Sequence, residues 1–64
     1  MSYMLYEVWT EDEVGHQEIV ETTASQKEAF EIAEQCMGEG HFAAIVYQET
    51  ETGDQKLIKR FESA

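Results

Sequence analysis

The chain has 64 residues, fourteen acidic and four basic, and its net charge is −10. This length allows one domain, residues 1–64, that buries only about 60% of the surface exposed by the unfolded chain. A hydrophobic content of 42% is too high for a disordered tail, no apolar run can span a bilayer, and the acidic excess disfavours direct nucleic-acid or anionic-membrane binding.

Cys36 is the single cysteine, so the chain can form no disulfide within itself. The first residues lack the basic region of a signal peptide. A free thiol without an export signal is typical of a reducing compartment. We therefore expect the protein to be cytoplasmic.

The N-terminal third of the sequence predicts a β-hairpin. Residues 3–10 are rich in aromatic and β-branched side chains, which favour a strand. Residues 11–15 are polar and end in Gly15, which can adopt the positive φ of a turn. Residues 17–23 then form a second, more polar strand.

An amphipathic helix is predicted over residues 26–37. Ser25 and Glu28 have the spacing of a capping box, in which each side chain accepts a hydrogen bond from the other residue's backbone N–H. Gly38 and Gly40 provide a left-handed stop. The apolar stripe of this helix comprises Ala29, Phe30, Ile32, Ala33, Cys36 and Met37. The opposite side carries Glu28, Glu31 and Glu34.

The C-terminal part predicts a second hairpin, with strands over residues 41–49 and 55–62 and a turn between them. The first and third strands are apolar on both faces, whereas the second and fourth carry the charges typical of edge strands. The expected fold is α+β, a ββαββ chain whose four-stranded antiparallel sheet has the order 2-1-3-4, with one helix packed on one face.

One helix covers only one face of such a sheet, yet both central strands are apolar on both sides. Alternation groups Tyr3, Leu5 and Trp9 on one side of the first strand, and Phe42 and Val46 on one side of the third. It does not settle which face takes the helix. We expect these five residues to form an interface with a second copy of the chain or with another protein.

Cys36 and His41 are the one grouping that resembles a nucleophile pair or half of a metal site. Cys36 falls on the apolar stripe of the helix, so a buried spacer is the preferred interpretation. Zinc would need further ligands, and the acids at residues 11–13 lack the spacing of a calcium loop. We expect no catalytic residue, no metal and no cofactor.

The aromatic side chains of Tyr6, Trp9 and Tyr47 are interpreted as core or interface rather than as a ligand platform. The leading hypothesis for function is a non-enzymatic protein-interaction module, homodimeric through the sheet face that the helix leaves uncovered.

In the alternative, Glu28, Glu31 and Glu34, together with the acids of the hairpin tips, would imitate the phosphates of a nucleic acid and inhibit a basic nucleic-acid-binding protein. In character, though in no motif, the chain resembles the small acidic inhibitors that phages encode. Solvation of a small apolar-rich domain is the simpler explanation of these charges.

Overall fold

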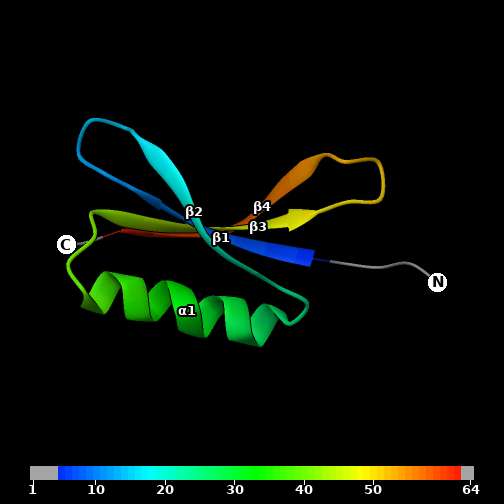
Figure 1. Ribbon diagram of the computed structural model, residues 1–64, viewed down its shortest axis with the longest axis horizontal. Helices are drawn as coiled ribbons and strands as arrows, with labels where there is room; N and C mark the ends of the chain where they lie inside the picture. Colours follow the sequence, from blue (N-terminus) through cyan, green and yellow to red (C-terminus); the bar gives the residue numbers. More distant parts are fainter. Residues whose placement is uncertain (1–4, 63–64) are drawn as a thin grey trace.

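The computed structural model describes residues 5–62, which form a four-stranded antiparallel sheet with one helix against one face (Figure 1). The strands are β1 (Leu5–Glu11), β2 (Gln17–Thr23), β3 (Ala43–Glu49) and β4 (Gln55–Glu62), and α1 (Gln26–Gly38) connects β2 to β3. The sheet order is β2-β1-β3-β4, so the predicted ββαββ topology is confirmed. Within these residues, no helix is long and apolar enough to cross a membrane.

Helix α1 begins with half of the predicted capping box. Ser25 is extended, and its hydroxyl accepts a hydrogen bond from the backbone N–H of Glu28 at 3.3 Å. The backbone N–H of Ser25 donates to the hydroxyl of Thr23 at 3.3 Å, so Thr23 takes the role that the sequence assigns to the Glu28 side chain. The first turn of the helix is thereby tied to the end of β2.

The end of α1 differs by one residue from the prediction. Gly38 is the last helical residue, and the right-handed Glu39 caps the helix by donating its N–H to the carbonyls of Gln35 and Cys36. Of Gly38 and Gly40, it is Gly40, with a φ of 99°, that has the left-handed conformation that favours glycine. Gly40 therefore turns the chain toward β3.

The core lies between α1 and the two central strands. Ala29 and Ala33 of the helix are fully buried, and Cys36 is 5% exposed. They pack against the face of the sheet that carries Val8 and Val46. Small side chains on the helix allow its axis to approach the sheet closely. This close packing removes the apolar surfaces of the helix and the sheet from water.

Larger side chains close the sides of this core. The partly buried residues that pack against it are Tyr6, Phe30, Ile32, Met37, Ile58 and Phe61. Phe30 of α1 meets Phe61 of β4 edge to face, with ring centroids 6.0 Å apart. This contact ties the edge strand β4 to the helix.

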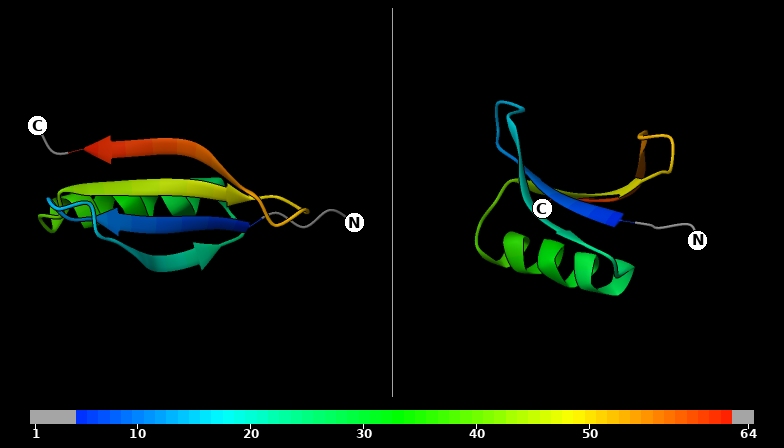
Figure 2. Two further views of the ribbon diagram at one scale, coloured as in Figure 1. Left: turned by 90° about the horizontal axis from the view of Figure 1, so that it is seen from above. Right: turned by 45° about the vertical axis from the view of Figure 1, so that its right-hand side comes forward.

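Both outer strand pairs contain a register shift. The β1–β2 register changes between Val8 and Trp9, and the β3–β4 register changes between Val46 and Tyr47. A β-bulge of this kind bends the strand and increases its twist. The bent strands lift the two hairpin turns away from the helix at opposite ends of the sheet (Figures 1 and 2).

The cap at Ser25 yields a test of the helix start. Ser25→Ala removes the acceptor for the Glu28 N–H, so we expect it to lower the free energy of unfolding by about 1 kcal/mol. For a domain of this size, that loss lowers the melting temperature by roughly 4–8 °C. Thermal unfolding followed by circular dichroism measures both values.

Ser25→Asp is the matched control, because its carboxylate can accept the same hydrogen bond and favours a helix N-terminus. A melting temperature that drops equally for both variants would contradict the capping role of the hydroxyl.

Candidate functional site

The face of the sheet opposite α1 is left uncovered by every other element of residues 5–62, as the left view in Figure 2 shows. We call it the open face and define it by the strand register. Its residues are Leu5, Glu7, Trp9 and Glu11 on β1, Gln17, Ile19 and Thr22 on β2, Ala43, Ile45, Tyr47 and Glu49 on β3, and Gln55, Leu57, Arg60 and Glu62 on β4.

Apolar side chains occupy the middle of the open face. Ile45 forms its floor at 1% exposure, and the half-buried Trp9 lies directly across from it on β1. On the two edge strands, Ile19 is 50% exposed and Leu57 is 56% exposed. The sheet therefore presents apolar surface to solvent on the side that the helix does not protect.

Glu7 is a carboxylate in the middle of this apolar surface. Its Oε1 accepts a hydrogen bond from the indole Nε1 of Trp9 at 3.1 Å and another from the side-chain amide of Gln55 at 2.6 Å. The ring of Trp9 meets the ring of Tyr47 edge to face, with centroids 6.3 Å apart and an interplanar angle of 90°. Tyr47 is also the residue directly opposite Glu7 on β3.

An ion-pair cluster lies at the end of the open face where β1 and β4 end. The guanidinium of Arg60 binds the carboxylate of Glu11 and, through Nε at 3.0 Å, that of Glu62. Glu11 also accepts a hydrogen bond from the side-chain amide of Gln17 at 2.9 Å. The hydrogen bond from Arg60, followed by that from Gln17, holds the pKa of Glu11 below its ordinary value. These bonds link β1, β2 and β4 across the sheet.

The open face brings together some of the predicted interface residues and not others. Leu5 and Trp9 lie on it, whereas Tyr3 is outside the described residues. Val46 does not belong to it, because it lies opposite Val8 on the helix-packed face and is fully buried there. Phe42 is 39% exposed but precedes β3, at the end of the sheet.

The sequence interpretation missed most of this site. Ile19, Leu57 and Glu7 are not among the predicted interface residues, although they share the open face with Trp9 and with Tyr47, for which the sequence predicts core or interface. Tyr6, which the sequence interprets as core or interface, packs against the core on the helix-packed face. The missing information is the pairing register, which decides which side of one strand faces the same way as a given side of the next.

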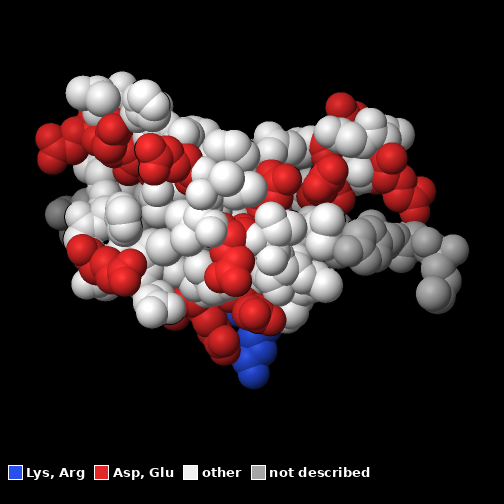
Figure 3. Space-filling model, in the orientation of Figure 1, with Lys and Arg blue, Asp and Glu red and all other residues white. Residues whose placement is uncertain are grey.

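Acidic side chains cover much of the remaining surface. Glu28, Glu31 and Glu34 are exposed on α1, and within residues 5–62 none of them forms an ion pair. In the view of Figure 3, acidic side chains gather on both raised ends of the molecule, and basic atoms show only at its lower edge, beside α1. The surface of the protein is therefore strongly anionic on several sides.

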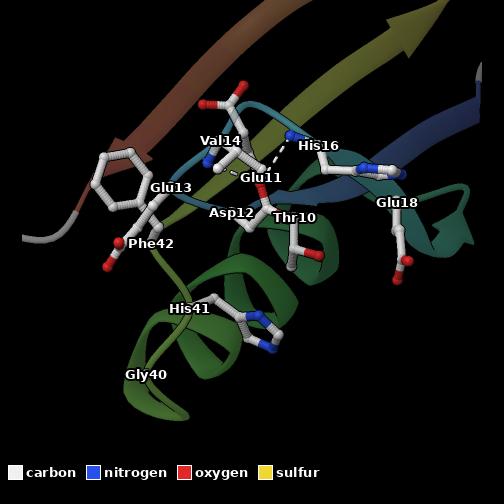
Figure 4. A pocket seen from close by; sticks show the side chains of 10 residues that line it. All are labelled: Thr10, Glu11, Asp12, Glu13, Val14, His16, Glu18, Gly40, His41 and Phe42. Carbon is white, nitrogen blue, oxygen red and sulfur yellow. Dashed lines mark hydrogen bonds between the residues drawn. The ribbon is translucent and has the colours of Figure 1, made fainter.

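An open cleft of about 720 Å³ lies between the β1–β2 turn and the connection from α1 to β3 (Figure 4). Its lining includes both histidines, and each is exposed. The carboxylate of Asp12 is engaged by its own turn, since it accepts hydrogen bonds from the backbone N–H groups of Val14 at 3.0 Å and His16 at 2.8 Å. No group of three or more potential ligands in the described chain is placed to bind a metal ion.

Cys36 and His41 do not form a nucleophile pair in this arrangement. Cys36 is buried in the core, as the spacer interpretation predicted, while His41 is exposed in the cleft. Burial and, to a smaller extent, the charge of Glu39 raise the pKa of the Cys36 thiol. A thiol that resists ionisation is a poor nucleophile.

Comparisons with known proteins return no match. No family model matches the sequence, and neither a curated protein nor a solved structure matches the chain. Its function must be argued from the open face, the cleft and the acidic surface.

The ion pair of Glu11 predicts a pH dependence of stability. A pKa below its ordinary value of 4.5 means that the pair stabilises the fold above that pH and loses this effect as the pH falls through the lowered pKa. We expect the difference in unfolding free energy between the wild type and Glu11→Gln to be largest at neutral pH and to shrink in acid. Urea unfolding of both proteins at a series of pH values measures this difference.

Glu51→Gln is the matched control, because it removes one negative charge from an exposed turn residue that forms no ion pair within residues 5–62. It corrects for the general effect of net charge. A Glu11→Gln difference that is the same in neutral and acidic solution would show that the Arg60 contact contributes nothing.

Proposed function

We propose that this chain is a non-enzymatic protein-interaction module and that the open face is its binding surface. The observation that supports the proposal is the apolar surface formed by Ile19 and Leu57, each about half exposed, around the partly buried rings of Trp9 and Tyr47. Contiguous apolar patches on small domains usually mark contact sites.

The composition of the open face suits a binding surface. Tryptophan, tyrosine and arginine dominate the energetic centres of protein interfaces, and Trp9, Tyr47 and Arg60 all lie on this face. The ionic groups at one end of the open face are already engaged, because Arg60 holds the carboxylates of Glu11 and Glu62. A partner therefore gains apolar contact without leaving these groups unsatisfied.

The occupant predicted from the sequence is a second copy of the chain, which would cover both open faces at once in a two-fold dimer. This remains a prediction. A buried, reduced Cys36 is compatible with the cytoplasm, where we propose that the protein acts.

A charge placed on the open face tests the proposal. Leu57→Asp removes apolar surface and adds a charge at a half-exposed position, so we expect it to weaken any association through this face by about tenfold or more. Sedimentation velocity at high micromolar concentration measures self-association, and affinity capture measures binding of other proteins.

Val14→Asp is the matched control, because it makes a similar change at an 87% exposed residue in the β1–β2 turn, outside the open face. It should leave association unchanged. A wild type that stays monomeric removes the second copy as the occupant, and equal effects of the two variants would show that the binding surface lies elsewhere.

The second candidate function is mimicry of a nucleic acid by the helix. Glu28, Glu31 and Glu34 are exposed on α1 and engage no cation within residues 5–62, so their charges are free to meet a basic protein. They lie on α1, which packs on the other face of the sheet (Figure 1), so the two candidate functions are separable.

Reversing the three helix charges to lysine should abolish salt-sensitive capture of a nucleic-acid-binding protein, since its basic site would then be repelled. Capture from a lysate, followed by a salt gradient, measures the effect, and Leu57→Asp should leave it unchanged. Capture that persists in the triple variant excludes the helix acids as the mimic.

A further inference from the structure

We infer that the partner of the open face presents a cationic side chain, arginine or lysine, that docks on Glu7 beside the rings of Trp9 and Tyr47. This inference rests on the proposed function, because it names the chemistry of the partner that the same surface takes. It follows from the arrangement of one carboxylate, two aromatic rings and the charges around them.

Glu7 has an unused charge at the centre of the open face. Both of its hydrogen bonds end on Oε1 and come from neutral donors, the indole of Trp9 and the amide of Gln55. Within residues 5–62, Glu7 forms no ion pair, and its Oε2 accepts no hydrogen bond. A carboxylate that a partner covers costs free energy unless a counter-charge meets it, so a bound partner has to supply a cation there.

The rings of Trp9 and Tyr47 add to this attraction. Their planes are perpendicular and their centroids lie 6.3 Å apart, an edge-to-face contact in which the edge of one ring meets the face of the other. The face of an aromatic ring attracts a cation that lies within about 6 Å of its centroid, tryptophan most strongly. The hydrogen bond from the indole Nε1 holds the Trp9 ring next to the carboxylate. A ring face that this contact leaves free and the carboxylate of Glu7 therefore favour the same ligand charge.

The other charged side chains of the open face are mostly negative, like Glu7. It carries the acids Glu7, Glu11, Glu49 and Glu62, and its one basic side chain within the described residues is Arg60. Arg60 is already bound to Glu11 and Glu62. The raised turns at both ends add Asp12 and Glu13 at one end, and Glu51 and Asp54 at the other. An apolar floor between acidic ends is complementary to a segment that combines apolar and basic side chains.

A second copy of this chain fits that charge pattern less well. Lys56 and Lys59 pair with β3 residues of the helix-packed face, Lys59 lies 4.9 Å from the ring centroid of Phe61, and Lys27 is on α1. Two chains stacked through their open faces would therefore place carboxylates against carboxylates, and the repulsion between these like charges disfavours that arrangement. Charge complementarity points to a different, basic protein.

Peptide binding tests the inference directly, because Trp9 is the single tryptophan and its emission reports on the site. The probe is a synthetic peptide of alternating arginine and leucine, compared with one in which glutamine replaces arginine. Glu7→Gln removes the charge but keeps an oxygen for the Trp9 and Gln55 donors. We expect it to weaken binding of the arginine peptide by about tenfold and to leave the glutamine peptide unaffected.

Glu28→Gln is the matched control, since it removes an exposed acid on α1 and should change affinity by less than about twofold. Glu7→Lys provides an independent arm, in which a glutamate–leucine peptide should bind better than the arginine peptide. Circular dichroism melts establish that each variant is folded. If Glu7→Gln is unfolded, the preference of Glu7→Lys decides the outcome.

Three results would overturn the inference. Equal losses in Glu7→Gln and Glu28→Gln would show that the peptide follows net charge rather than the carboxylate of Glu7 beside Trp9 and Tyr47. Absence of arginine-peptide binding, together with a dimer that Leu57→Asp dissociates, would assign the open face to a second copy and leave the proposed function intact. Absence of both peptide binding and any association sensitive to Leu57→Asp would reject the two together.

Discussion

The packing of a narrow, small-residue helix face on two central strands determines the rest of this structure. Ala29 and Ala33 bring α1 close to Val8 and Val46, and this single contact layer supplies the core. A chain with one helix has no second layer for the other side of the sheet. The open face exists because this second layer is missing, and it is apolar because both central strands carry apolar side chains on both sides.

Local sequence patterns were enough to predict the elements and their order. Aromatic and β-branched runs marked the strands, the capping serine at position 25 marked the helix start, and charge on the outer strands placed them at the edges. These signals act within a few residues of chain. The details that failed depend on neighbours in space, as when Thr23 rather than Glu28 meets the Ser25 N–H.

The candidate site was only partly predictable for the same reason. Alternation places Leu5 and Trp9 on one side of β1, and the structure agrees. Alternation within β3 cannot show that Ile45 and Tyr47, rather than Val46, share that side, because the offset between two strands is fixed by their pairing. The bulges shift the pairing of β2 and β4 again. The role of Glu7 also depends on Gln55, forty-eight residues away in the chain.

The two bulges limit how this protein can assemble. A flat sheet with two free edges invites strand-by-strand polymerisation, and a bend in an outer strand spoils the straight template that such growth needs. Both outer pairs are bent, and the face between them is concave, as the profile in Figure 3 shows. On the binding function proposed above, a single occupant would fill this hollow, and the complex would have a closed, fixed stoichiometry instead of growing into fibres.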